Sequence, residues 1–244
     1  MKDIITFSSL SKIKGLVHGF STKSLGSMSR DLSKDSVDIT PLAKRLNVSM
    51  EDVIGMDQVH GTQIYMVGNM DTTHTMGKTD GLITKDKSTF LYGTFADCVP
   101  IFLVDPKTRF VGIIHSGFRG TLDNIVGKTM QLLKKNGVDP KRIRVGIGPS
   151  IRNCCYSILP ERALLFSETF PLWQKKILTK KGRKIYLSLQ KIVMLQLIEE
   201  GIQKKNIEEK QLCTSCKKTM FFSFRRTHTK EGYTHKQAGI IGWR

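Results

Sequence analysis

Residues 89–115 read TFLYGTFADCVPIFLVDPKTRFVGIIH, and the three apolar runs in this stretch decide the class of fold. Two short polar segments separate the runs, Ala96–Cys98 and Asp105–Thr108. The second segment, Asp-Pro-Lys-Thr, is typical of a turn because Pro presets φ and Asp bonds the backbone two residues on. Apolar runs bounded in this way indicate buried strands, so residues 89–115 are predicted to contain adjacent antiparallel strands.

The same pattern continues on both sides of this stretch. Strands are predicted at Gln63–Val67, Gly81–Thr84, Thr89–Phe95, Ile101–Val104, Phe110–His115 and Ile143–Ile147. Helices are predicted from a Thr121 cap to Gly137 and over 188–200, with shorter ones at 41–47 and 160–168. Strands and helices intermix without strict alternation, and no linker-like stretch divides the chain. A single α/β domain with mixed sheets is therefore expected over residues 1–244.

The composition is that of a folded chain with a large positive charge. The 244 residues are 39% hydrophobic, and 39 Lys and Arg against 21 Asp and Glu give +18. Residues 1–80 hold nine basic and nine acidic residues, whereas residues 161–244 hold eighteen and seven. This excess favours anionic partners. Its densest run, 175–184, is interpreted as a solvated lysine-rich loop, because its aromatic neighbours are limited to Trp173 and Tyr186.

The five cysteines cannot all pair within one chain, and the N-terminus MKDIITF lacks the apolar stretch of a signal peptide. No uncharged apolar run reaches the roughly 18 residues needed to span a bilayer. A reducing cytoplasm and no membrane contact are therefore expected. Cys213 and Cys216 have no second Cys-x-x-Cys near them, and the adjacent Cys154 and Cys155 do not easily chelate one metal. Both pairs are interpreted as packing or incidental thiols.

Reactive side chains occur at three predicted strand ends: His60 in DQVHG, Cys98 in ADCVP and His115 in HSGFRG. Two imidazoles and a thiolate make a ligand set suited to zinc, and three protein ligands leave a fourth position for water or substrate. The spacings of 38 and 17 residues match no short metal motif. The alternative to a metal site is therefore that these histidines are hydrogen-bonded separately in the core. For His18, likewise, a role in the site and a hydrogen bond in the core both remain open.

Eight short phrases together are more informative than any one motif. They are HGFST (18–22), DQVHG (57–61), TDGLIT (79–84), ADCVP (96–100), HSGFRGT (115–121), IGPSI (147–151), CT (213–214) and FSFRR (222–226). In this order they resemble the YfiH-type proteins, also called the multicopper polyphenol oxidase or laccase-domain family, from about residue 17 to the C-terminus. The resemblance implies a four-layered α/β/β/α domain and a zinc ion held by His60, Cys98 and His115.

The resemblance also implies purine nucleoside chemistry: phosphorolysis of adenosine, inosine, guanosine and methylthioadenosine, and deamination of adenosine. Some members are described as copper-dependent phenol oxidases and others as peptidoglycan-editing factors. Six histidines are too few for a multicopper cluster, which ranks the oxidase lower. The usual zinc deaminase has a glutamate two residues after a metal histidine, where this chain has Thr62 and Gly117. Asp97 is therefore the expected acid or base.

Phosphorolysis requires cations that hold phosphate beside the nucleoside. Arg119 precedes the predicted helix start at Thr121, where free amides favour an anion. Arg225 and Arg226 follow a predicted strand at 222–224, whose alternation allows one of them to face the site. The expected partners are a purine nucleoside and phosphate, with Arg119 and Arg225 binding substrate.

Two other classes of function remain open. In the first, Cys98 is a nucleophile and His115 its base, and the enzyme hydrolyses an amide-like bond in a cell-wall precursor without metal. In the second, the +18 charge serves nucleic-acid binding, which the absence of interleaved aromatic residues disfavours. The chain also departs from the family pattern, with Lys23 for arginine, Phe118 for tryptophan, Ser157 for glutamate and His235-Lys236 for Gly-Arg. These departures predict an altered substrate preference.

Overall fold

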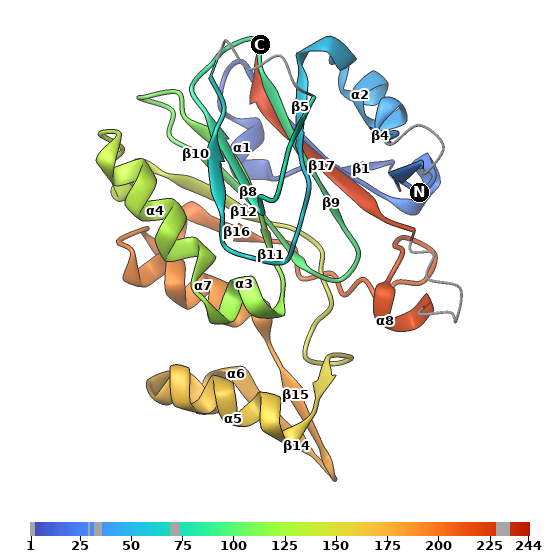
Figure 1. Cartoon of the computed structure of the whole chain (residues 1–244), viewed down its shortest axis with the longest axis vertical. Helices are drawn as coiled ribbons and strands as arrows, with labels where there is room; N and C mark the ends of the chain where they lie inside the picture. Colours follow the sequence, from blue (N-terminus) through green and yellow to red (C-terminus); the bar gives the residue numbers. More distant parts are fainter. Residues whose placement is uncertain (1–2, 29, 32–35, 69–73, 228–234) are drawn as a thin grey trace.

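The computed structural model describes residues 3–28, 30–31, 36–68, 74–227 and 235–244. Within these residues the longer strands form two six-stranded sheets (Figure 1). The first sheet has the order β1 (Ile4–Ile5), β2 (Leu16–Ser21), β17 (Gln237–Trp243), β9 (Phe90–Phe95), β5 (Val53–Met56) and β7 (Thr75–Met76). The second has the order β16 (Ile207–Glu209), β12 (Arg144–Ile147), β10 (Val99–Val104), β11 (Val111–Ser116), β8 (Gly81–Thr84) and β6 (Ile64–Met66). Both sheets contain parallel and antiparallel pairs, so the expected mixed sheets are confirmed.

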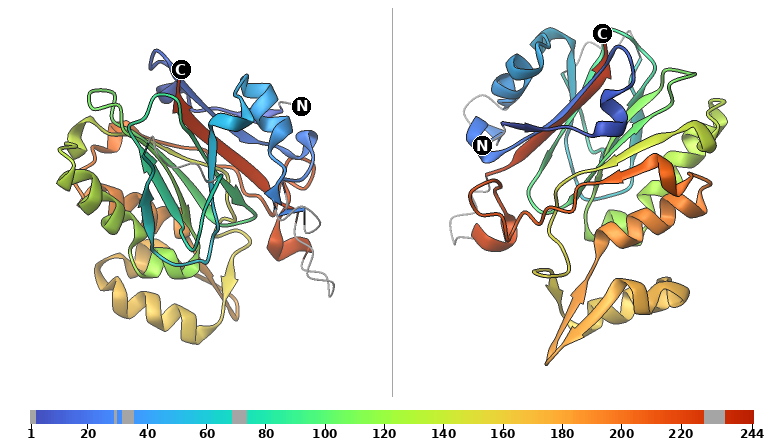
Figure 2. Two further views of the ribbon diagram at one scale, coloured as in Figure 1. Left: turned by 45° about the horizontal axis from the view of Figure 1, so that its top comes forward. Right: turned by 180° about the vertical axis from the view of Figure 1, so that it is seen from behind.

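The two sheets face each other, and helices cover their outer faces (Figure 2). Eight α-helices lie within the described residues: α1 (Ser8–Ser11), α2 (Thr40–Leu46), α3 (Phe118–Leu122), α4 (Ile125–Lys135), α5 (Pro160–Thr169), α6 (Gln174–Ile177), α7 (Leu189–Glu199) and α8 (Phe224–Thr227). Short 3₁₀ turns occur at η1 (Lys23–Leu25), η2 (Met50–Asp52), η3 (Pro140–Arg142), η4 (Pro171–Trp173) and η5 (Lys204–Asn206). Helices α4 and α7 pack on the second sheet and α2 on the first, which gives the four-layered α/β/β/α arrangement.

Strand β10 shows how one sequence run serves two cores. Its odd positions, Ile101 and Leu103, pack against the helices α4 and α7, whereas Phe102 and Val104 pack between the sheets. Successive side chains of a strand point to opposite faces, so a strand buried on both faces is apolar at every position. This double burial explains the continuous apolar runs in the sequence.

The six predicted strands are all present, and each boundary lies within two residues of its prediction. Strands β10 and β11 form the predicted antiparallel pair, with Val104 opposite Val111 across the turn. Strand β9 lies in the other sheet, because residues 96–98 carry the chain from the first sheet to the second. The helices predicted at 41–47, 160–168 and 188–200 correspond to α2, α5 and α7.

The predicted helix cap at Thr121 is wrong. The helical segment begins earlier, at Phe118, and is interrupted at Asp123–Asn124 before α4 begins. Asn124 has a left-handed backbone and its side chain accepts a hydrogen bond from Gly127 N, so Asn124 caps α4. Thr121 lies inside α3, where its hydroxyl contacts that of Ser116 at 2.7 Å.

Residues 157–187 form a smaller layer that extends from the lower part of the molecule (Figure 1). It contains a three-stranded sheet of β13 (Ser157–Ile158), β15 (Lys184–Leu187) and β14 (Leu178–Lys181), beside α5 and α6. The predicted lysine-rich loop is instead α6 followed by the β14–β15 hairpin, although its six basic side chains are exposed as expected. A two-stranded pair, β3 (Arg30–Asp31) and β4 (Ser36–Val37), completes the described sheets. Among the described residues, no helix combines the length and apolar character needed to cross a bilayer.

Candidate metal centre and cavity

Three segments bring His60, Cys98 and His115 together at one end of the facing sheets. His60 lies in the loop after β5, Cys98 at the crossing from β9 to β10, and His115 near the end of β11. A ligand nitrogen of each histidine and the Cys98 sulfur all lie within 4.8 Å of one another. The two imidazole rings meet edge to face with centroids 4.9 Å apart. The sequence prediction that these three residues form one cluster therefore agrees with the geometry.

Asp80, to which no role was assigned from the sequence, fixes the orientation of His115. Its Oδ1 lies 2.8 Å from His115 Nδ1, and both side chains are almost completely buried. A carboxylate accepts hydrogen bonds, so His115 Nδ1 carries the proton and Nε2 is left to face the cluster. This is the arrangement in which an outer carboxylate orients a metal-binding histidine. The sequence signal that could have marked Asp80 was its position directly before the predicted strand at 81–84, in the phrase Thr79-Asp80-Gly81.

The same carboxylate also shapes the loop that carries His60. Asp80 accepts hydrogen bonds from the amides of Val59, His60 and Gly61 at 3.3, 3.0 and 2.7 Å. His60 has φ of 60°, in the left-handed region that few non-glycine residues adopt. The three amide contacts hold this unusual turn, so Asp80 positions both histidines.

The charges of Cys98 and His115 depend on each other. Burial disfavours both ionised forms, but His115 lowers the pKa of the Cys98 thiol to about 6. In return, despite burial, Cys98 and Asp80 raise the pKa of His115 to about 9. Burial also raises the pKa of Asp80, but His115 and the loop amides outweigh it and lower that pKa overall. Without a metal, therefore, the cluster favours a thiolate beside an imidazolium.

Asp97 neighbours this cluster but has three hydrogen-bond donors of its own. Its carboxylate accepts from Thr214 Oγ1 at 2.5 Å, Ser223 Oγ at 2.9 Å and Arg225 N at 2.7 Å. Its backbone also has a positive φ, of 86°. These three donors hold the carboxylate in place, and the acid or base role expected of Asp97 from the sequence stays a prediction. Through these contacts Asp97 joins its own loop to the loops that carry Thr214 and Ser223.

A cavity of about 440 Å³ opens in front of the cluster. Its volume lies within the range of pockets that hold small organic ligands, roughly 300–1,000 Å³. The lining combines the cluster with aromatic, apolar and cationic side chains: Gln58, His60, Thr94, Ala96, Asp97, Cys98, His115, Phe118, Ile151, Tyr156, Arg162, Leu189, Phe224, Arg225 and Lys236. The cavity can therefore hold a ligand with both a flat ring and a negative charge.

The cations of this lining differ from those expected. Arg225 lines the cavity, but Arg119 is exposed on α3 and is not among the lining residues. Arg162, which was not singled out from the sequence, takes part in the lining, as does Lys236, one of the departures from the family pattern. Arg162 comes from α5, about 60 residues before Arg225, and its guanidinium lies over the Phe118 ring at 4.9 Å. No local sequence pattern marked Arg162, because its position in the cavity lining depends on how α5 packs.

Arg225 and Arg226 have opposite environments. The predicted strand at 222–224 is wrong, since Phe224–Thr227 form the single turn α8. Arg225 stacks over Tyr156 at 5.1 Å and donates from Nη1 to Ser157 O at 3.0 Å. Arg226 instead donates to the carbonyls of Thr214, Ser215 and Phe221. Arg225 is thus available to a ligand, and Arg226 fixes the backbone beneath it.

The residues present fit a bound metal ion on two counts. The donor set of two nitrogens and one ionisable sulfur is one that zinc accepts, with His115 already oriented by Asp80. Gly117 leaves room beside the donors, because a Cβ added there would lie 3.1 Å from Cys98 Sγ and 3.3 Å from His60 Cδ2.

The fold and the site together define a class of protein: a four-layered α/β/β/α chain with a His-Cys-His cluster at the end of its facing sheets. The chain belongs to the multi-copper polyphenol oxidoreductase laccase family, whose model matches residues 14–244. This agrees with the family resemblance seen in the eight sequence phrases.

Named relatives and a solved structure support this membership. The chain is 31% identical to the purine nucleoside phosphorylase YlmD of Geobacillus stearothermophilus, over 94% of this chain and 91% of that protein. It is 28% identical to the adenosine deaminase RL5 of an unknown prokaryotic organism, over 79% and 77%. The crystal structure of Bacillus licheniformis YfiH has a TM-score of 0.86 and 27% identity, and the match covers 100% of both chains.

Proposed function

We propose that this protein is a zinc-dependent purine nucleoside phosphorylase that acts on adenosine, inosine, guanosine and methylthioadenosine and also deaminates adenosine. One observation carries the proposal: the cluster of His60, Cys98 and His115 lies in a cavity that Arg162, Arg225 and Lys236 also line. A metal centre facing a cationic pocket suits a reaction between a neutral nucleoside and phosphate. Relatives named purine nucleoside phosphorylase and adenosine deaminase support the same assignment.

In this proposal different cavity residues bind the phosphate and the purine. Arg162 and Arg225 bind phosphate, because guanidinium groups match its oxygens in a planar, bidentate way. Phe118 and Tyr156 provide aromatic surface for the purine. Burial raises the pKa of Tyr156 to about 12, so its hydroxyl remains a neutral hydrogen-bond donor. Asp80 keeps His115 in the tautomer that directs Nε2 toward the cluster.

Zinc bound to His60, Cys98 and His115 would supply Lewis-acid chemistry, polarising a substrate oxygen or lowering the pKa of a bound water. The low pKa of Cys98, about 6, supports this ligand role because less free energy is needed to release the thiol proton. Zinc is preferred to copper because two imidazoles and one thiolate, with a position open to the cavity, match zinc catalytic sites.

The test combines metal content with the phosphate dependence of base release. Purified protein should release free base from inosine or adenosine when phosphate is present, and ammonia from adenosine without it. The Cys98→Ala variant should lose the zinc ion of the His60, Cys98 and His115 cluster. It should also lose both the release of free base and the release of ammonia. Full activity in Cys98→Ala, or base release that ignores phosphate, contradicts the proposal.

The thiolate beside an imidazolium favours one second candidate, a metal-free Cys-His hydrolase acting on an amide-like bond in a cell-wall precursor. A thiol alkylator separates the two candidates in protein stripped by a chelator. If alkylation of Cys98 is prevented by added zinc, and stripped protein is inactive, the phosphorylase assignment is supported. If stripped protein remains active until Cys98 is alkylated, the hydrolase is supported instead.

A further inference from the structure

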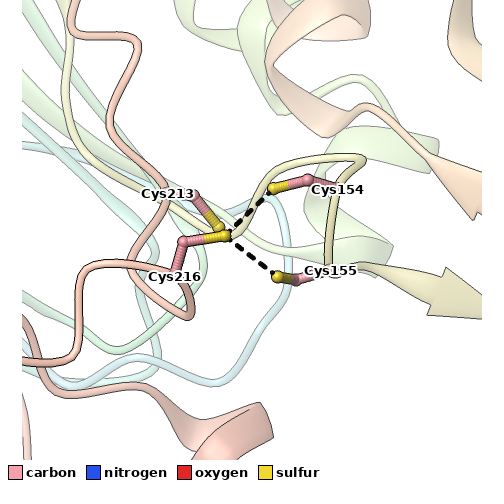
Figure 3. Close-up of side chains that lie close together, drawn as sticks. All are labelled: Cys154, Cys155, Cys213 and Cys216. Carbon is pink, nitrogen blue, oxygen red and sulfur yellow. Dashed lines mark hydrogen bonds between the residues drawn. The ribbon is translucent and has the colours of Figure 1, made fainter.

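Four cysteines outside the cavity form a second cluster (Figure 3). The sulfurs of Cys154, Cys155, Cys213 and Cys216 all lie within 4.8 Å of one another. Cys216 Sγ is 3.4 Å from Cys154 Sγ and 3.3 Å from Cys155 Sγ. A disulfide requires about 2.05 Å, so these sulfurs are close but not bonded.

Two turns far apart in the sequence bring these sulfurs together. Cys154 and Cys155 lie in the turn after β12, where the amides of Cys155 and Tyr156 both bond the carbonyl of Arg152. Because a turn does not impose the alternation of a strand, adjacent side chains can point to the same place. Figure 3 shows both directed toward Cys216. The fold therefore brings together two cysteine pairs that the sequence analysis treated separately.

Cys213 and Cys216 lie in the other turn, after β16, with the Cys-x-x-Cys spacing that metal sites often use. The turn is fixed to the first by a bridge between Ser150 and Cys213 and by a hydrogen bond from Thr214 N to Ser150 O. Arg152 N also donates to Cys213 Sγ at 3.4 Å. Backbone amides that donate to a sulfur stabilise its thiolate form, which is the form that binds metals.

The spacing of the four sulfurs suits a single tetrahedral ion. Sulfurs held at about 2.3 Å from zinc in a tetrahedron lie about 3.8 Å from one another. The observed distances, 3.3 and 3.4 Å at the close contacts and at most 4.8 Å elsewhere, bracket this value. Four thiolates leave no open position, which is the property of a structural and not a catalytic zinc site.

The surroundings match the charge of such a site. Zinc with four thiolates carries a net charge of about −2, with the thiol protons released to water. Arg226 donates to the carbonyls of Thr214 and Ser215, within the Cys213–Cys216 turn, and brings a positive charge to it. Cys213 is buried, while Cys154 and Cys216 are exposed, so an ion can reach the cluster from the solvent.

The four-cysteine cluster lies where a bound ion would stabilise the wall of the cavity. Tyr156 follows Cys155 and lines the cavity, and Thr214 follows Cys213 and donates to Asp97. An ion shared by the two turns would fix one wall of the cavity to the loop that holds Asp97. We propose that Cys154, Cys155, Cys213 and Cys216 bind one structural zinc ion that joins these two turns. The proposal does not depend on the reaction catalysed in the cavity.

The experiment uses full-length, reduced protein carrying His60→Ala, which removes a ligand of the cavity cluster. This background is titrated with Co²⁺ and then with Zn²⁺ under anaerobic conditions. The expected result is one equivalent of Co²⁺ with the intense visible bands of a tetrahedral, thiolate-rich site, displaced by one equivalent of Zn²⁺. No stoichiometric uptake, or binding without those bands, overturns the proposal.

Variants of the exposed ligands keep the test independent of folding. Cys154→Ser and Cys216→Ser, each in the His60→Ala background, should no longer bind the one equivalent of Co²⁺. Circular dichroism checks that each variant is folded. Ser215→Ala, in the same turn, is the matched control and should still bind the equivalent of Co²⁺. Undiminished uptake in folded Cys154→Ser and Cys216→Ser protein, a disulfide among the four cysteines in freshly isolated protein, or iron in place of zinc overturns the assignment.

Discussion

Asp80 Oδ1 accepts a hydrogen bond from His115 Nδ1 at 2.8 Å, and the same carboxylate receives three amides of the loop that carries His60. A single buried side chain thus positions ligands from two separate segments. Because both oxygens are occupied by donors, the carboxylate cannot be replaced by a group that itself donates. Metal binding in the cavity is therefore expected to depend on Asp80.

Asp80→Asn should lower the zinc affinity of the cavity cluster by about 10- to 100-fold, the usual effect of losing an outer partner. The asparagine amide must face either the His115 and His60 donors or the Val59 and Gly61 amides, and it repels whichever pair it meets. Competition with a chromophoric chelator measures the affinity, in protein whose four-cysteine cluster is already loaded. Unchanged affinity would show that Asp80 does not orient the histidines.

Asp105→Asn provides the matched control for that prediction. Asp105 is also buried, and both its oxygens accept hydrogen bonds, from Arg142, Thr108 and the Lys107 amide. It lies in the turn between β10 and β11 and is not among the lining residues of the cavity. The substitution should reduce the free energy of unfolding and leave the zinc affinity as it is in wild type.

The sequence could predict the cluster because its three residues follow apolar strands. Continuous apolar runs located β6, β9, β10 and β11, and the three residues lie beside the ends of these strands at one edge of the facing sheets. The cations were harder to predict. Arg119 was chosen on an assumed helix start at Thr121, but Asn124 caps α4 and α3 begins three residues before Thr121.

The remaining site residues depend on contacts between distant segments. Arg162 lines the cavity because α5 packs beneath it, and no sequence pattern near Arg162 carries that information. The four cysteines likewise converge through a bridge between Ser150 and Cys213, 63 positions apart in the chain. Local sequence patterns specify secondary structure. Contacts between distant segments depend on tertiary packing, which the residue spacing within one helix or strand does not encode.

Gly117→Ala should weaken zinc binding in the cavity by at least about tenfold, comparable to other changes around metal ligands. The backbone of Gly117 has φ of −86°, which alanine accepts, so the effect is steric. The new Cβ would lie 3.1 Å from Cys98 Sγ and 3.3 Å from His60 Cδ2, and a metal site tolerates shifts of only about 0.2 Å. The same chelator competition measures the change. Gly77→Ala, whose Cβ would meet no atom within 4 Å, should bind zinc normally.

Arg225→Ala and Arg162→Ala should each raise the KM for phosphate by about 10- to 100-fold, the loss expected for one charged hydrogen bond. The KM for the nucleoside should change less, because the aromatic lining remains. Initial rates at varied phosphate measure the effect. Arg183→Ala, on the exposed β14–β15 hairpin, is the charge-matched control. A large effect in Arg119→Ala with none in Arg162→Ala would instead support the cations expected from the sequence, Arg119 and Arg225.

His18 should make the fold sensitive to acid. It is buried, Phe7 N donates to its Nε2 at 2.9 Å, and burial lowers its pKa from 6.5 to about 4. Between pH 6.5 and 4 the unfolded chain therefore binds a proton that the folded protein excludes, and the free energy of unfolding falls as the pH falls. The difference of about 2.5 pKa units corresponds to about 3 kcal/mol across this window.

His18→Gln should remove that part of the pH dependence, because the glutamine oxygen can accept the Phe7 hydrogen bond and does not titrate. Urea unfolding at several pH values between 4.5 and 7 measures the slope in both proteins. Comparison with wild type cancels the contribution of the other titrating groups. The exposed His74→Gln variant should keep the wild-type slope. Equal slopes in wild type and His18→Gln would show that burial of His18 does not oppose its protonation.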